Sequence, residues 1–121
     1  MKFLSRLLPL VILFVAAGCG KSTGYWKEQM KSADSSKRLH AVHAFQERTK
    51  DKQAVPLLIG ALDDEDTFIR RDAARALGKF GQNAREAVPA LVVHLKDSEP
   101  SVRKASAQAL KEIDPTAVTS R

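Results

Sequence analysis

The chain has 121 residues, of which 44% are hydrophobic and 6% aromatic, and its 20 Lys and Arg against 14 Asp and Glu give a formal net charge of +6. This composition is typical of a folded domain, and with a single cysteine it excludes collagen-like, low-complexity and disulfide-scaffold proteins. The positive charge is uneven, because residues 21–53 hold 8 basic and 4 acidic residues, whereas residues 54–121 hold 10 of each.

The N-terminus has the pattern of an export signal. Lys2 and Arg6 precede an apolar run at 7–17, which is shorter than the about 20 residues that a membrane-spanning helix needs. Residues 1–18 are therefore predicted to be a signal peptide that is cleaved off. The sequence Ala-Ala-Gly-Cys at 16–19 resembles the lipobox of bacterial lipoproteins, in which the cysteine is lipidated and becomes the new N-terminus.

This resemblance implies that Cys19 carries a lipid anchor and that residues 19–23 are the lipidated N-terminus and a linker. The expected location is the bacterial cell envelope. Gly20 follows the cysteine in place of Asp, which in Gram-negative lipoproteins resembles the default sorting to the outer membrane. The alternative is an ordinary signal peptide followed by a free thiol, but lipidation accounts for an exported cysteine that has no disulfide partner.

The remaining chain contains an internal repeat. Ala-Val-Pro at 54–56 recurs at 87–89, an offset of 33 residues, and a degenerate copy lies upstream at an offset of 32. The offset of 33 also pairs Leu58 with Leu91, Leu62 with Leu95, Asp64 with Asp97, Arg70 with Arg103, Ala74 with Ala107 and Leu77 with Leu110. We predict one repeat domain over 24–115, divided into units at 24–50, 51–83 and 84–115, with a C-terminal tail at 116–121.

Each unit is predicted to be a pair of helices, because apolar residues recur at three- and four-residue steps without period-two alternation. Pro56 and Pro89 fit the first turn of a helix. Acidic residues at 63–66 and 97–99 suit the starts of the helices that follow, and Gly78 and Gly81 suit a helix end. The six expected helices are Trp26–Met30, Lys37–Glu47, Val55–Leu62, Asp66–Phe80, Ala87–Leu95 and Ser101–Ile113.

The repeated pattern resembles the HEAT-like repeats of phycobilin lyases. The resemblance rests on Ala-Val-Pro-x-Leu, Leu-x-Asp, Ile/Val-Arg and Ala-x-Ala-Leu, found in this order at 54–77 and 87–110. It implies an all-α fold, a short α-solenoid of about three HEAT-like helical hairpins, in which the first and last units act as caps. The same resemblance says little about function, because such repeats support many activities.

Several polar residues are candidates for functional sites. Arg70 and Arg103 recur with the structural period, which favours pairing with acidic residues of their own or the adjacent unit. The acidic run at 63–66 lacks the spaced oxygen ligands and the glycine of a calcium loop. His40 and His43 are three residues apart on one expected helix, which is compatible with metal binding, but nothing nearby in the sequence completes a site.

No catalytic constellation or cofactor motif is recognised, and no metal or cofactor is expected. Deoxyhypusine hydroxylases, which have similar repeats, bind iron through adjacent His-Glu pairs, and this chain has no such pair. Phycobilin lyases are much longer proteins.

The sequence therefore favours a non-catalytic, membrane-tethered scaffold that binds an unknown envelope protein. The expected interaction face is formed by Phe68, Arg71 and Arg75, with Phe68 as an exposed apolar anchor. The basic excess near the anchor suits anionic lipid head groups or a solvated surface, and nucleic acid is not an expected partner because aromatic residues are not interleaved with the basic ones. The alternatives are an enzyme or enzyme fragment related to the metal hydroxylases or phycobilin lyases, and a self-associating structural protein.

Overall fold

The computed structural model describes residues 20–116, which form α-helices and one 3₁₀ helix and include no strand. The elements are α2 (Thr23–Gln29), α3 (Ser35–Gln46), α4 (Ala54–Ala61), α5 (Thr67–Phe80), η1 (Gly81–Ala87), α6 (Val88–His94) and α7 (Pro100–Ile113). Each of the six expected helices is present, with boundaries that differ by up to three residues. The predicted all-α fold is confirmed.

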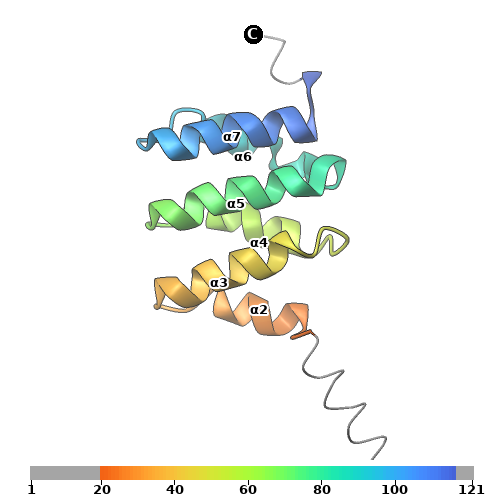
Figure 1. Ribbon diagram of the computed structural model, residues 1–121, viewed down its shortest axis with the longest axis vertical. Helices are drawn as coiled ribbons and strands as arrows, with labels where there is room; N and C mark the ends of the chain where they lie inside the picture. Colours follow the sequence, from red (N-terminus) through yellow and green to blue (C-terminus); the bar gives the residue numbers. More distant parts are fainter. Residues whose placement is uncertain (1–19, 117–121) are drawn as a thin grey trace, which may run out of the picture.

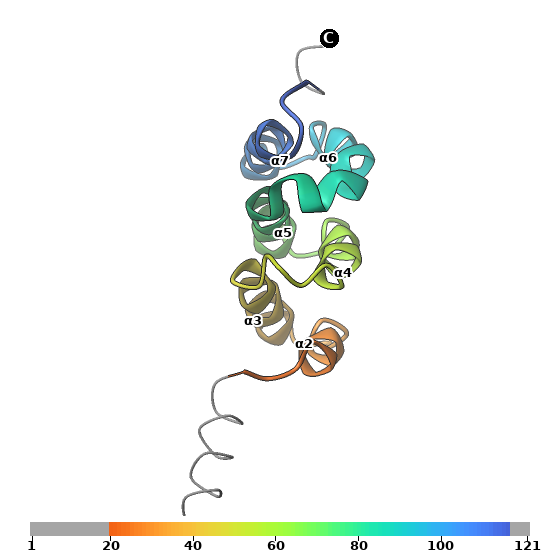
Figure 2. The same cartoon turned by 90° about the vertical axis from the view of Figure 1, so that its right-hand side faces the viewer.

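The helices form two layers (Figures 1 and 2). One layer contains α3, α5 and α7 side by side, and the other contains α2, α4 and α6. Successive hairpins stack along the long axis, so that the first unit (α2 and α3) lies at one end and the third unit (η1, α6 and α7) at the other. This arrangement is a short α-solenoid of three hairpins, as the repeat predicts.

Small and branched apolar residues fill the space between the layers. Leu58, Ile69, Leu77 and Leu91 are fully buried and come from the second and third units. The fully buried alanines of α5 are Ala73, Ala74 and Ala76. An alanine leaves room for a neighbouring helix to approach closely, which a larger side chain at the same position would prevent.

The start of α5 follows the predicted chemistry, and the start of α3 has the same kind of cap. Asp34 and Asp66 are the N-caps of α3 and α5, and each side chain accepts a hydrogen bond from the backbone N–H two residues later. Glu99, the N-cap of α7, makes no such bond. Asp97 accepts from the N–H of Glu99 at 3.0 Å, as Asp64 accepts from the N–H of Asp66 at 2.9 Å, so the third turn keeps this bond and lacks only the bond from the N-cap side chain.

The segment after α5 differs from the expectation. Gly81 ends α5 with a φ of 54°, a left-handed conformation that glycine adopts readily. The chain then continues as the 3₁₀ helix η1 and not as an open loop, and it buries Ala84 and Ala87 against the core. Repeat spacing alone did not predict this element, because it does not recur: the corresponding segment after α3, residues 47–53, contains no helix.

The outer units bury fewer apolar residues than the middle unit. Helix α2 has no buried residue. In α7 the hydroxyl of Ser106 is buried without a hydrogen-bond partner among the described residues, at the position that Ala73 occupies in the middle unit. The middle unit therefore carries the most apolar packing of the stack.

Candidate functional site

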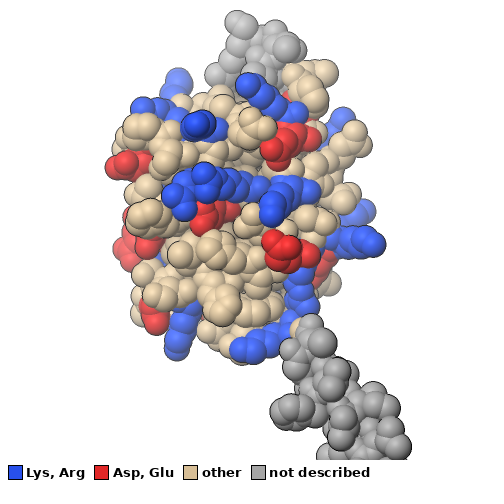
Figure 3. Space-filling model, in the orientation of Figure 1, with Lys and Arg blue, Asp and Glu red and all other residues tan. Residues whose placement is uncertain are grey.

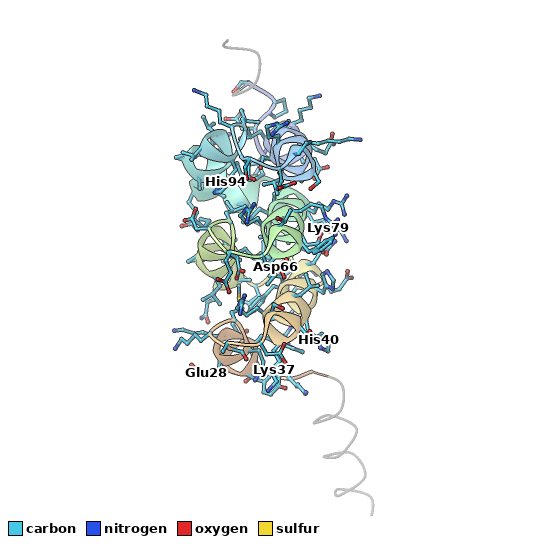
Figure 4. The ribbon with its side chains drawn as sticks, turned by 90° about the vertical axis from the view of Figure 1, so that its left-hand side faces the viewer. Glu28, Lys37, His40, Asp66, Lys79 and His94 are labelled. Carbon is cyan, nitrogen blue, oxygen red and sulfur yellow. The ribbon has the colours of Figure 1, made fainter. Side chains whose placement is uncertain are left out.

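The most prominent exposed feature of the α3, α5, α7 layer is a stripe along α5. Phe68, Arg71, Arg75 and Lys79 are three or four residues apart, which places them on the same side of the helix. Phe68 is 58% exposed, and Arg75 and Lys79 are also exposed, whereas Arg71 is half-buried. We refer to these four residues as the α5 face. Figure 3 shows Lys and Arg side chains crossing the middle of this layer, and Figure 4 shows Lys79 pointing away from the α4 and α6 layer.

A buried carboxylate holds the arginines of the α5 face in place. Arg71 donates from Nε to Asp72 Oδ1 at 2.8 Å, and Arg75 Nη1 lies 3.6 Å from the same oxygen. The guanidinium carbon of Arg71 is 5.2 Å from the centre of the Phe68 ring, a distance typical of a cation–π contact. Asp72 therefore fixes a cation against an exposed aromatic ring.

Asp72 also connects α5 to α3. The other carboxylate oxygen lies 2.7 Å from Nε2 of His43. Burial alone raises the pKa of Asp72, but hydrogen bonds from Arg71 and His43 outweigh it and lower the pKa below its ordinary value. Sequence reasoning identified Phe68, Arg71 and Arg75 but missed Asp72, His43 and Lys79 as parts of this surface.

A shallow hollow adjoins the α5 face. It has a volume of about 210 Å³ and lies between α3, α5 and α7. Its lining residues are Gln46, Arg75, Lys79, Ala105, Gln108, Ala109 and Glu112. Arg75 and Lys79 place two cations at its wall, Glu112 places a carboxylate there, and Nζ of Lys79 lies 3.6 Å from Oε1 of Glu47.

A second set of arginines joins the repeats. Arg38, Arg70 and Arg103 hold equivalent positions, and each donates from Nη1 to two backbone carbonyls of the turn in its own unit at 2.7 to 3.2 Å. Arg38 and Arg70 also donate from Nε and Nη2 to both carboxylate oxygens of the aspartate in the next unit, Asp64 and Asp97 respectively, at 2.8 to 3.2 Å. We call each such arrangement an inter-repeat clamp. The predicted structural role of Arg70 is confirmed.

The clamp aspartates have lowered pKa values. Burial raises the pKa of Asp97, but hydrogen bonds from Arg70, from the backbone N–H of Glu99 and from His94 lower it to about 2. The pKa of Asp64 is also lowered, because the hydrogen bonds from Arg38 and the N–H of Asp66 outweigh burial. Both aspartates are therefore carboxylates at neutral pH.

The three histidines are engaged in separate contacts. His94 lies between two carboxylates, with Nδ1 at 2.9 Å from Asp97 and Nε2 at 3.1 Å from Asp63, and Figure 4 shows it in the upper half of the stack. The ring of His40 packs against Trp26 with centres 5.2 Å apart. No group of three or more potential metal ligands occurs in the part of the chain that the structure describes.

Cys19 and the predicted signal peptide at 1–18 lie outside the described residues, as does the tail beyond Thr116. Among residues 20–116, none of the helices combines the length and the apolar character that crossing a bilayer requires.

Comparison with known proteins agrees with this architecture. A family model for HEAT repeats matches residues 25–111. A chain in the solved structure of the complex of CpcE and CpcF of phycocyanin lyase from Nostoc sp. PCC7120 is similar to this protein, with 36% sequence identity and a TM-score of 0.73. The match covers 83% of this chain and 40% of that chain, so the protein spans less than half of the length of that lyase chain. No curated protein matches the sequence.

Proposed function

The chain belongs to the HEAT-repeat family, and from this premise we propose that it is a non-catalytic protein-interaction module of the bacterial cell envelope, tethered through a lipid on Cys19. The α5 face is the observation that carries the proposal. The face combines an exposed aromatic ring and two exposed cations with Arg71, which Asp72 already holds against the ring, so that Arg71 loses little side-chain entropy when a partner binds.

The proposed partner is an envelope protein whose contact surface combines acidic and apolar side chains. The acidic groups would lie against Arg71, Arg75 and Lys79, and an apolar side chain would lie against Phe68. The hollow beside Arg75 gives this surface a concave point at which a side chain can be enclosed. The similar lyase chain belongs to a complex of two proteins, CpcE and CpcF, which supports an interaction role for the repeats.

The tether supplies the mechanism. A lipid anchor confines the repeats to one membrane surface and raises the effective concentration of the module for a partner in the same membrane. The segment at 21–53, with 8 basic and 4 acidic residues, follows the anchor directly. Basic residues near a bilayer contribute about 1 kcal/mol each when the lipid head groups are anionic, so the first unit is suited to lie towards the membrane.

Affinity capture from native membranes tests the interaction. The tagged, full-length protein is crosslinked and purified, and co-purifying proteins are identified. We expect one specific envelope protein, which is lost when Phe68, Arg71 and Arg75 are all changed to Ala. A control with Lys52, Arg85 and Val93 changed to Ala removes two cations and one apolar side chain from outside the α5 face, and it should retain the partner. Equal capture by both triple variants would contradict the assignment of the face.

The anchor has its own test. Intact-mass analysis of the mature protein should show a new N-terminus at Cys19 that carries acyl chains, and the Cys19→Ser variant should not be lipidated. An unmodified cysteine, or cleavage at another residue, would remove the tether from the proposal and leave the α5 face to be judged by the capture experiment.

A second candidate function follows from the similar lyase structure. The chain would then be a component of a chromophore-handling enzyme, since it is 36% identical to a chain of the phycocyanin lyase complex. The visible absorption spectrum and metal content of the purified protein test this candidate, which requires a coloured ligand or a bound metal. Self-association, the third possibility, is tested by light scattering on the same sample.

A further inference from the structure

The C-terminal end of the stack carries half of an inter-repeat clamp. Arg103 donates from Nη1 to the backbone carbonyls of Asp97 and Ser98 at 2.7 and 3.2 Å, as Arg38 and Arg70 do in their own turns. Its Nε and Nη2 atoms have no partner among residues 20–116, whereas the same atoms of Arg38 and Arg70 hold an aspartate of the next unit. The guanidinium of Arg103 is therefore ordered, exposed and lacks the carboxylate of a following repeat.

Three apolar residues of the third unit are partly exposed. Val92, Leu95 and Ala107 are half-buried, and they are equivalent to Ile59, Leu62 and Ala74 of the middle unit by the offset of 33 residues. Leu62 and Ala74 are fully buried in the middle unit, which has a further unit stacked on it. Val92, Leu95, Arg103 and Ala107 together form what we call the end face.

We propose that the end face is a docking surface for another helical-repeat protein that places an aspartate from the turn between two of its helices on Arg103. The chemistry of the clamp defines the partner. The two free donor atoms of the guanidinium fit both oxygens of one carboxylate, which is the arrangement seen at Asp64 and Asp97. In this chain those aspartates lie in Leu-x-Asp sequences between two helices, and we expect the partner to present the same pattern.

A second copy of this chain does not meet that requirement. The position equivalent to Asp64 and Asp97 is Ser32 in the first unit. The hydrogen bonds confirm the equivalence, because Ser32 Oγ accepts from the N–H two residues later at 3.2 Å, as Asp64 Oδ1 and Asp97 Oδ1 do at 2.9 and 3.0 Å. The first unit thus offers a hydroxyl to Arg103 and no carboxylate.

Charge also disfavours head-to-tail stacking of identical chains. The head of the chain, residues 21–53, holds 8 basic and 4 acidic residues. The end face is accompanied by the exposed cations Lys96 and Lys111. Bringing these two basic surfaces together is unfavourable, whereas an acidic turn from a different protein complements the end face. The inference goes beyond the proposed function, because it requires neither the anchor nor the α5 face.

Site-specific photocrosslinking of the full-length protein in its native cells tests the inference. A photoreactive amino acid replaces Lys96, whose equivalent in the middle unit, Asp63, contacts His94 of the next unit. The crosslinked peptide of the partner is then sequenced. We expect a peptide from the turn between two helices of a repeat protein, with an aspartate in it.

Variants at two neighbouring positions provide the matched comparison. Arg103→Gln and Lys104→Gln remove one positive charge each, but only Arg103 is placed to bind the carboxylate. We expect Arg103→Gln to lower the crosslink yield at least about tenfold and Lys104→Gln to leave it unchanged. Arg103→Lys keeps the charge but lacks the two-pronged donor, and it should also lose most of the yield.

Thermal unfolding of each variant separates loss of docking from loss of folding, and the Arg103→Lys result is used if Arg103→Gln is unfolded. A crosslink to lipid, to a second copy of this chain or to a peptide without an aspartate would overturn the inference. The absence of any adduct, or equal yields for the Arg103 and Lys104 variants, would do the same. None of these outcomes affects capture by the α5 face.

Discussion

The first and second units meet at one joint, and the second and third units meet at a second joint. Both joints contain the same clamp but differ in the packing around it. At the second joint, Gly78 lets α7 approach so closely that a Cβ at this position would lie 3.1 Å from the Cα of Ala109, and His94 adds a bridge to Asp63. At the first joint, Gln46 replaces Gly78 and Ala61 replaces His94. That joint instead carries a polar pair, His43 with Asp72.

This difference shows which properties belong to the repeat and which belong to one joint. The arginine and the aspartate recur with the period, so the clamp forms wherever two units meet. The close approach of α5 and α7, and the pair of His43 with Asp72, depend on single residues that do not recur with the period. The following predictions use this contrast, in order of decreasing expected effect.

Removing a clamp arginine at a joint should cost the most stability. Arg70→Gln leaves Asp97, whose side chain is 6% exposed, as a buried carboxylate without its main partner. We expect the free energy of unfolding to fall by about 3 kcal/mol, measured by urea denaturation. Arg103→Gln removes an equivalent arginine that has no carboxylate partner among residues 20–116, and it should cost less than about 1 kcal/mol. Equal losses would show that the carboxylate contributes nothing.

Acid should weaken the second joint through Asp97. Its pKa is about 2 in the folded protein against an ordinary 3.8, so the unfolded chain binds more protons in this interval and stability is lost as the pH falls from about 4 to about 2. The loss amounts to about 2 kcal/mol. Urea denaturation at a series of pH values measures it, and Asp97→Asn should reduce the slope in this interval. An unchanged slope in Asp97→Asn would exclude Asp97 as its source.

Two glycine substitutions compare a crowded helix position with an open one. Gly78→Ala places a methyl group against Ala109 and the side chain of Glu112, and we expect it to destabilise the protein by about 1 kcal/mol. At Gly60 no atom outside the adjacent backbone of α4 lies within 4 Å of where a Cβ would be. Gly60→Ala should therefore stabilise α4 by about 0.5 to 1 kcal/mol through helix propensity. Thermal melting gives both values, and a stabilising Gly78→Ala would contradict the close packing of this joint.

The polar pair at the first joint should contribute the least. His43 is half exposed, and Asp72 keeps its bond to Arg71 when the histidine is removed. His43→Ala should change the free energy of unfolding by about 0.5 kcal/mol at neutral pH. His43→Gln, which can still donate a hydrogen bond, should lose less than the alanine variant. A loss above about 2 kcal/mol would show that this pair, and not the clamp, holds the first joint.

The sequence predicted the features that recur with the repeat. Helix order, the buried leucines and alanines and the role of Arg70 all follow from residues that keep a fixed spacing. The pair of His43 and Asp72 could not be predicted, because its residues are 29 positions apart and meet only through the lateral offset of α3 and α5. The repeat does mark Asp72 as unusual, because the equivalent position in the third unit is the apolar residue Ala105.

Photocrosslinking from position 68 in native membranes decides whether the α5 face binds an envelope protein. A photoreactive residue replaces Phe68 in one version of the full-length protein and Val93, an exposed apolar residue of α6, in another. We expect a specific protein adduct from position 68 that is absent from position 93 and is lost when Arg71 and Arg75 are changed to Ala. Adducts with lipid alone, or the same protein adduct from both positions, would contradict it.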